Sequence, residues 1–268
     1  MLISILGFIA ALIIGIVLGL TGGGGSILTV PVFVYLLGID PVLATGYSLF
    51  VVGISSMFGA IKNLQKGLVS FGTSLIFAIP AVVAVFSTRK FIIPAIPEVI
   101  FQNQSILFTK DVAIMVFFAI LMLAASFSMI LDKKKKIIET GTDKPKTTNY
   151  FSLILLGVFT GIVTGLVGAG GGFIIVPILI FLAKLPIKKA AATSLFIIAL
   201  NSLIGFLGDA LQIEIDWTFL LSFSAFAIVG IFIGIYLNKF IDGAKLKKAF
   251  GWLVLVMGIY IFYKEMMM

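Results

Sequence analysis

Long apolar segments recur from one end of this chain to the other. Most of them are about 18 to 22 residues long, which matches the roughly 20 residues that a helix needs to cross a hydrocarbon core of about 30 Å. Hydrophobic residues make up 61% of the sequence and charged residues only 11%, so most of the folded surface must face lipid. The sequence therefore predicts an all-α, polytopic protein of the cell membrane, surrounded by membrane lipids.

The chain also repeats itself at a fixed offset of 146 residues. The stretch GIVLGLTGGGGSILTVP, residues 15–31, aligns without a gap with GIVTGLVGAGGGFIIVP, residues 161–177. The register persists downstream, where Gly59 falls on Gly205. Glycines and prolines that match at one offset predict a duplication, with a first membrane repeat over 1–131, a linker over 132–149 and a second membrane repeat over 150–268. Together the two repeats make one transport domain.

Each repeat offers five apolar segments. They cover residues 2–20, 26–38, 42–61, 71–88 and 111–131 in the first repeat, and 150–168, 173–183, 190–207, 217–237 and 249–263 in the second. The second segment of each repeat is the unusual one, because a helix of that length spans only about 20 Å. Each of these two short segments directly follows a run of glycines.

The distribution of lysines predicts the topology. Most lysines lie in short connections, and the linker 132–149 is the richest in them, so the positive-inside rule places it in the cytoplasm. Counting crossings then puts the acidic stretch 209–216 and the connection 91–108 on the outer side, the latter as an interfacial segment rather than a spanning helix. An odd number of crossings in each repeat makes the two repeats inverted. Lysines confined to membrane loops also argue against a nucleic-acid partner, despite a net charge of +8.

The glycine runs Gly22–Gly25 and Gly168–Gly172 interrupt apolar helices at equivalent places. In inverted-repeat transporters, such breaks bring free backbone groups to the bilayer midplane and form the substrate site. A helix that starts at each break, with Ser26 available as a cap in the first, directs N–H groups and a positive dipole end toward the break. The breaks therefore predict an anion site built from backbone. Close helix packing through glycine is the alternative interpretation.

Uncharged polar residues lie at membrane depth in both repeats, and hydroxyl and amide groups suit an oxyanion. Thr45, Tyr47, Ser48, Ser55 and Ser56 are expected to face Thr193, Ser194, Asn201 and Ser202. No acidic or basic residue lies well inside a predicted helix, so backbone and hydroxyl groups would have to supply the attraction. The candidate substrate-binding residues are Thr21, Gly22, Gly23, Gly24, Gly25, Ser26, Tyr47, Ser48, Gly168, Gly170, Gly171, Gly172, Thr193, Ser194 and Asn201.

The absence of Cys and His removes disulfides, haem and thiolate metal sites, and His-dependent nucleophiles. The sequence therefore predicts a protein that is not an enzyme and that holds no metal or cofactor. Because an inside-negative potential favours anion efflux by about 2.3 kcal/mol per charge per 100 mV, a potential-driven exporter is physically sufficient. An antiporter that uses Asp40 or Asp209 stays open, and the sequence sets no oligomeric state.

Taken together, these residues resemble the sulfite exporter TauE/SafE family. The resemblance rests on the duplicated G-x-x-x-G-x-x-G-x-G-G pattern with its following proline, on ATGYSLF and AAATSLF downstream, and on the lysine-rich linker, and it covers essentially the whole chain. It implies a permease, expected to export sulfite or small organosulfur anions such as organosulfonates. An anion channel, another small-anion permease, and a non-transporting assembly or lipid-handling protein remain the alternatives.

Overall fold

The structure is a computed structural model that describes residues 2–103, 106–131, 150–210, 214–241 and 243–267. The linker 132–149 and residues 211–213 of the acidic stretch lie outside the described residues. Seven of the described helical stretches are long and apolar enough to cross a membrane: Pro41–Leu64, Phe71–Ala95, Lys110–Ile130, Tyr150–Val167, Ile187–Asp209, Trp217–Leu237 and Lys248–Met267. The prediction of an all-α, multi-pass membrane protein is confirmed.

The helices begin and end close to the predicted segments. The first half holds α1 (Leu2–Thr21), η1 (Gly24–Leu28), α2 (Thr29–Pro31), η2 (Val32–Leu36), α3 (Pro41–Leu64), α4 (Phe71–Ser87), η3 (Thr88–Ile92), α5 (Ile93–Ala95) and α6 (Lys110–Ile130). The second half holds α7 (Tyr150–Val167), α8 (Gly172–Phe181), α9 (Ile187–Asp209), α10 (Trp217–Leu237) and α11 (Gly243–Met267). Both predicted short segments are present, and each starts at its glycine run.

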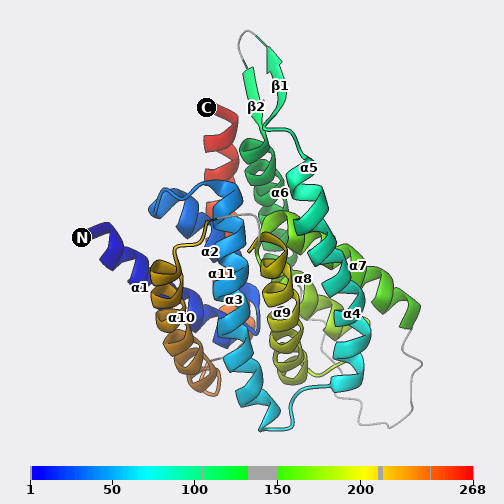
Figure 1. Ribbon diagram of the computed structural model, residues 1–268. Coiled ribbons are helices and arrows are strands. Elements are labelled where there is room, and N and C mark those ends of the chain that lie inside the picture. Colours follow the sequence, from blue (N-terminus) through cyan, green and yellow to red (C-terminus); the bar gives the residue numbers. More distant parts are fainter. Residues whose placement is uncertain (1, 104–105, 132–149, 211–213, 242, 268) are drawn as a thin grey trace.

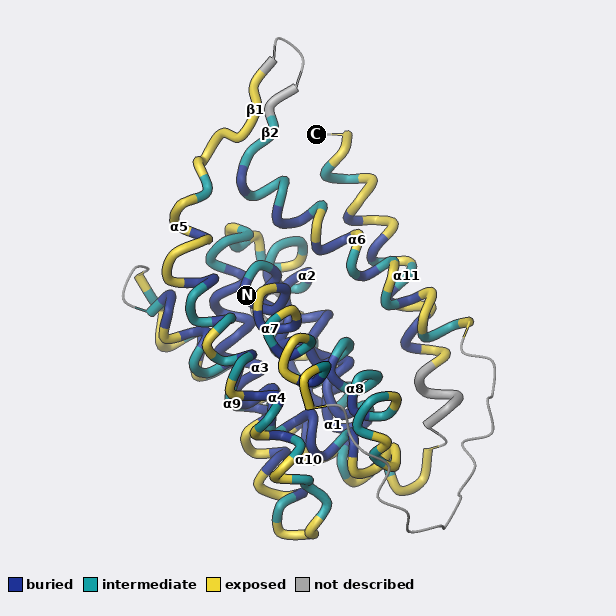
Figure 2. The backbone as a smooth tube through the Cα atoms, turned by 90° about the vertical axis from the view of Figure 1, so that its right-hand side faces the viewer, coloured by how far each residue is buried: buried dark blue, intermediate teal, exposed yellow. Residues whose placement is uncertain are grey.

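Two antiparallel helices, α3 and α9, form the centre of the molecule. Gly53 of α3 lies against Leu203 of α9, and Gly59 lies against Leu195, so the two helices run in opposite directions. They are the two most buried of the spanning helices, and the outward faces of the surrounding helices carry the exposed apolar residues (Figure 2). This centre is where the polar residues of both halves gather.

Two further helix pairs pack through small residues. Gly15 and Gly19 of α1 contact the backbone of α10 near Ala227 and Ile231. In the other pair, Gly161 of α7 contacts the backbone of α4. Small residues let helices approach to backbone distance in membranes, where the hydrophobic effect between helices is absent. Each pair joins one helix of the first half to one helix of the second (Figure 1).

Contacts between the halves are reciprocal at the offset of 146. Gly59 lies against Leu195 and Ile231, while Gly205 lies against the equivalent Leu49 and Val85. The backbone contact between Gly15 and Ala227 likewise has a counterpart between Gly161 and Ala81. With α3 and α9 antiparallel, these exchanged contacts support the prediction that the halves are inverted repeats.

Acidic residues gather at one end of the molecule, whereas basic residues occur at both ends. Lys66, Lys188 and Lys239 line one cavity, and we call the end that holds them the lysine end. At the opposite end, which we call the acidic end, lie Asp40, Glu98, Asp111, Asp209 and Asp216, together with Arg89 and Lys110, which pair with Asp209 and Glu98. The cavity lysines and the acidic residues therefore lie at opposite ends, and the sides of the membrane that the sequence assigns to them stay a prediction.

The connection between α4 and α6 is partly different from the prediction. The helical stretch that begins at Phe71 continues to Ala95, so residues 91–95 belong to a spanning helix and not to the connection. Beyond it, β1 (Val99–Asn103) and β2 (Ile106–Thr109) pair antiparallel and project from the acidic end as a hairpin (Figure 1). The remainder of the connection is therefore not a spanning helix, as expected, but its hairpin was not foreseen.

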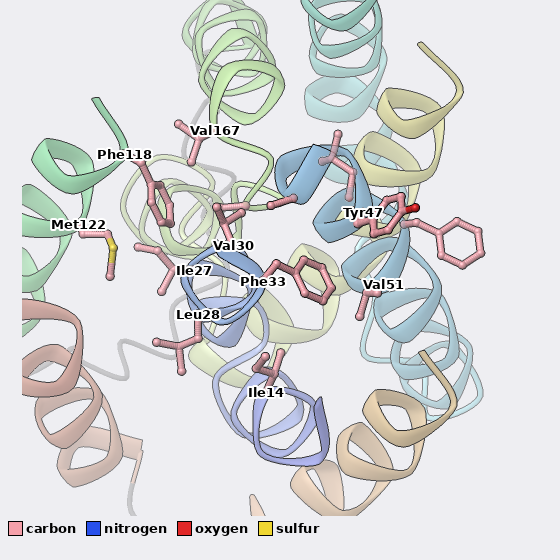
Figure 3. Close-up of a cluster of buried hydrophobic side chains, with 14 of the residues drawn as sticks. Ile14, Ile27, Leu28, Val30, Phe33, Tyr47, Val51, Phe118, Met122 and Val167 are labelled. Atoms are coloured by element: carbon pink, nitrogen blue, oxygen red, sulfur yellow. The ribbon is translucent and has the colours of Figure 1, made fainter. Parts of the chain in front are cut away.

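A cluster of buried apolar side chains holds in place the short segment Gly24–Leu36, which begins within the first glycine run. Phe33 of η2 is fully buried, and its ring lies 4.8 Å from that of Phe223 and 6.4 Å from that of Tyr47. Ile27, Leu28 and Val30 from the same segment contribute to the cluster, together with Phe118 and Met122 of α6 (Figure 3). Aromatic contacts at these separations add to the energy of burial, so this short segment is anchored despite its broken helix.

Candidate functional site

The first glycine break turns the chain back after α1. Gly22 and Gly23 have φ angles of +73° and +142°, a region that residues with a Cβ rarely adopt. The N-cap of the new helix is Gly23, and the Thr21 hydroxyl accepts a hydrogen bond from the Gly24 N–H at 2.9 Å, which satisfies one free N–H at the helix start. Ser26, predicted as this cap, instead donates its hydroxyl to the Gly23 carbonyl at 2.7 Å, because the 3-10 helix already begins at Gly24.

The second glycine break has the same start but a different continuation. Gly168 has a φ of +73°, like Gly22, but Gly170 and Gly171 also have positive φ angles, and α8 begins only at Gly172. Gly168 lies against Thr45 on α3, and Gly22 lies against Ala191 on α9, which is the residue equivalent to Thr45. The two halves thus dock their breaks onto each other's central helix in equivalent ways.

The structure brings the two breaks into contact. A Cβ added to Gly23 would meet the backbone of Gly172, and one added to Gly172 would overlap the backbone of Gly23. The Ser194 hydroxyl donates to the Gly22 carbonyl. Most of the other break glycines, however, pack against neighbouring side chains, as Gly171 does against Thr164, so packing accounts for part of the glycine content.

The two central helices α3 and α9, on which the breaks dock, carry several buried polar side chains without partners. Within the described part of the chain, neither polar atom of the fully buried Asn201 amide has a hydrogen-bond partner. The same is true of the buried hydroxyls of Ser48, Ser55, Ser56 and Ser202. The hydroxyl oxygen of Ser202 lies 3.1 Å from where a Cβ on Gly170 would be. Because an unsatisfied buried polar group costs about 1 to 3 kcal/mol, such a concentration is unexpected in a purely structural core.

Two predicted site residues have other partners. Thr193 accepts a hydrogen bond from the Ser70 N–H at 3.0 Å, and Tyr47 accepts one from the Asp216 N–H at 2.8 Å. Ser70 and Asp216 immediately precede α4 and α10, and they are themselves 146 residues apart. Both hydroxyls therefore hold equivalent loops at opposite ends of the molecule.

A cavity of about 230 Å³ opens beside the first break at the lysine end. Its lining includes Gly22 and Asn63 together with Lys66, Lys188 and Lys239. Burial, followed by the positive charges of Lys239 and Lys62, lowers the pKa of Lys66 from its ordinary value. Several cations around one cavity attract anions and raise their local concentration. The sequence predicted that these lysines lie on the same side of the membrane, but it did not predict that they line one cavity.

A buried ion pair lies at the acidic end, where the sequence predicted no embedded charge. Arg89 of η3 is fully buried, and its Nη1 lies 3.1 Å from Oδ2 of Asp209 and donates to the Thr45 hydroxyl at 3.0 Å. Both helices run past the predicted segments 71–88 and 190–207, which carries the two charged residues inside the helical bundle. The signal in the sequence was the single arginine of the chain, which directly follows the predicted apolar segment 71–88.

Among the described residues, no group of three or more His, Cys, Asp or Glu side chains could hold a metal ion. The chemistry that this arrangement supports is binding: cations and backbone groups at one end, hydroxyls and an amide in the centre, and a single guanidinium at the other end.

Comparison with known proteins matches residues 7–261 to the sequence profile of the sulfite exporter TauE/SafE family. A "Probable membrane transporter protein" of Xylella fastidiosa (strain Temecula1) is 27% identical, over 94% of this chain and 92% of its own length. "Probable membrane transporter protein YunE" of Bacillus subtilis is 26% identical, over 96% of this chain and 98% of its own. No solved structure matches the chain significantly.

Proposed function

Since this chain belongs to the sulfite exporter TauE/SafE family of membrane transporters, we propose that it exports sulfite or small organosulfonate anions through the interface between α3 and α9. The anion would collect in the lysine-lined cavity, pass Gly22 and bind where the two glycine breaks meet. It would then leave past the second break at the acidic end. In this proposal the membrane potential supplies the driving force, because each outward-moving negative charge gains about 2.3 kcal/mol per 100 mV.

The observation that carries the proposal is the Asn201 amide. Its two polar atoms are fully buried and have no partner within the described residues, and it lies on the central helix that also presents Ser194 to the first break. An oxyanion that accepts from the amide NH₂ and from the hydroxyls of Ser55 and Ser202 would satisfy groups that otherwise destabilise the core. Binding would be modest, because neutral donors surround the centre.

Replacing Asn201 by Leu tests this site, because leucine keeps much of the shape and removes both polar atoms. We expect efflux of sulfite from loaded proteoliposomes to fall at least tenfold. The thermal midpoint of the purified protein should stay level or rise, because an unsatisfied buried amide is removed. A structural amide would give the opposite pair of results, a lower midpoint with normal efflux, and the site would then be wrong.

Ser126→Ala is the matched control. Ser126 is fully buried on α6, but its hydroxyl donates to the Leu123 carbonyl at 2.7 Å and lies outside the α3 and α9 interface, so efflux should be unchanged.

The same assay with methanesulfonate, sulfate and acetate tests the substrate class. Equal rates for acetate and sulfite would show that the site does not select sulfur oxyanions.

A further inference from the structure

We propose that Arg89 is a second anion-binding residue, at the exit on the acidic end, and that the Asp209 carboxylate occupies it and keeps the exit closed until an anion replaces it. This inference rests on the proposed function, because it gives the exported anion its last binding site. Asp209 acts here as a tethered substitute for the anion, because a carboxylate and a sulfonate can each offer two oxygens side by side to a guanidinium.

The pair is close but loosely bonded. Nη1 of Arg89 lies 3.1 Å from Oδ2 of Asp209, yet that oxygen makes no hydrogen bond within the described residues. The Nε and Nη2 donors of Arg89 also have no partner there. A guanidinium carries five N–H donors and binds best when two of them contact one anion side by side. Arg89 therefore keeps the donors that a bidentate oxyanion requires, while Oδ2 of Asp209 contacts only one of its nitrogens.

Arg89 is coupled to the second glycine break through one residue. Its Nη1 donates to the Thr45 hydroxyl, and Thr45 is the residue against which Gly168 lies. A Cβ added to Gly208, next to Asp209, would lie 2.8 Å from the Arg89 Cβ, so the glycine allows Arg89 to approach α9 closely. Arg89 also lies on a π-helical turn, a local irregularity that is frequent at functional sites. An anion that leaves the centre past Gly168 reaches this guanidinium next.

The fold itself does not require the pair. The residues equivalent to Arg89 and Asp209 at the offset of 146 are Ile235 and Asn63, and both line the open cavity at the lysine end. The same architecture is therefore built there without an ion pair. Buried ion pairs contribute little net stability compared with apolar residues of similar size. Arg89 and Asp209 are best explained by a task that only the acidic end performs.

Cysteine accessibility tests the closed exit independently of transport, because the chain contains no cysteine. Val52→Cys places a thiol on α3 beside Gly170, at a site that is 1% exposed and deeper than Thr45. A membrane-impermeant maleimide added at the acidic end should label it poorly in the parent protein. Adding Asp209→Asn should raise the labelling rate at least tenfold, and methanesulfonate should raise it in the protein that keeps Asp209. Unchanged labelling in folded Asp209→Asn protein would overturn the proposal.

The double variant Arg89→Gln with Asp209→Asn keeps the proposal testable if the single variant does not fold. Replacing both members of a buried pair by neutral groups leaves no unpaired charge, so the thermal midpoint should stay near that of the parent. We expect sulfite efflux below one tenth of the parent rate, because the exit has lost its anion acceptor. Normal efflux from this folded variant would assign the pair a structural role. If labelling changes as expected while no sulfite moves in any variant, the substrate is wrong but the exit is right.

Discussion

The two glycine breaks have the same scaffold but different electrostatic surroundings. Gly22 and Gly168 share a φ of +73° and contact equivalent residues of the opposite central helix. Yet the first break borders a cavity with three lysines, and the second lies below a closed ion pair. The repeat thus supplies the architecture twice, whereas the charges that distinguish the ends occur once. A few residues that differ between the repeats are therefore enough to make the two ends unlike and to favour one direction of transport.

The two kinds of cation at the ends also suit different tasks. Lysines at an open cavity interact with anions through water, so they attract many anions weakly and release them quickly. A buried arginine interacts strongly, and it must be neutralised whenever no anion is present. This difference explains why an acidic partner accompanies Arg89 and no acidic residue lines the lysine cavity.

Removing the arginine alone should have the largest effect on stability. Arg89→Leu leaves the Asp209 carboxylate buried without its partner, which costs about 3 to 5 kcal/mol. At the equivalent position of the other half, Ile235→Leu should cost less than about 1.5 kcal/mol, because volume and polarity are conserved. Thermal unfolding of both variants in detergent measures the contrast. Equal losses at the two positions would break the comparison between the ends.

Substitution of the first glycine of each break should have a smaller and equal effect at both ends. Gly22→Ala and Gly168→Ala each force a Cβ into a positive-φ residue and into the backbone of the facing helix, which together cost about 2 to 4 kcal/mol. Gly67→Ala is the matched control, because Gly67 also has a positive φ, +65°, but a Cβ there meets nothing within 4 Å. It should cost about 1 kcal/mol. A large difference between Gly22 and Gly168 would argue against equivalent docking.

Neutralising the lysine cavity should have the smallest effect. Changing Lys66, Lys188 and Lys239 to Gln should weaken sulfite affinity on that side by about two- to fivefold per lysine, less at high salt. Lys189→Gln, an exposed lysine outside the cavity lining, is the control. Because its lowered pKa makes Lys66 lose its proton at a lower pH than an ordinary lysine, part of this attraction should vanish first as the solution becomes alkaline. If the sulfite affinity changes neither with salt nor with the three substitutions, the cavity is not part of the transport pathway.

Much of the fold followed from the sequence because hydrophobic length and glycine position are local signals. Most predicted segments and helices agree to within a few residues, apart from the longer stretch Phe71–Ala95 and the earlier start of α11, and the short helices start where the glycine runs predict them. The offset of 146 aligned Gly59 with Gly205, but the sequence alone did not predict that they contact Leu195 and Leu49.

The features that were missed depend on tertiary contacts. Whether Arg89 faces water or Asp209 depends on how far α4 and α9 extend beyond their apolar segments, and hydropathy does not determine that length. Tyr47 and Thr193 carry the hydroxyls expected of site residues, but these hydroxyls accept hydrogen bonds from the backbone N–H groups of neighbouring loops. The hairpin of β1 and β2 was read only as an interruption of helix, because proline and polar residues indicate a break without indicating its replacement.

The glycine-lined contacts of α1 with α10 and of α4 with α7 have a mechanical consequence. Backbones in direct contact cannot slide, so each pair should move as one rigid body, and each body contains a helix from both halves. Each unit that moves during a transport cycle would then combine helices from both repeats, so the moving units would not coincide with the repeats. A disulfide between Phe8→Cys and Phe226→Cys, whose rings stack at 5.0 Å within the α1–α10 body, should leave efflux intact. One between Phe71→Cys and Phe196→Cys, which ties the α4–α7 body to the central helix α9, should stop it.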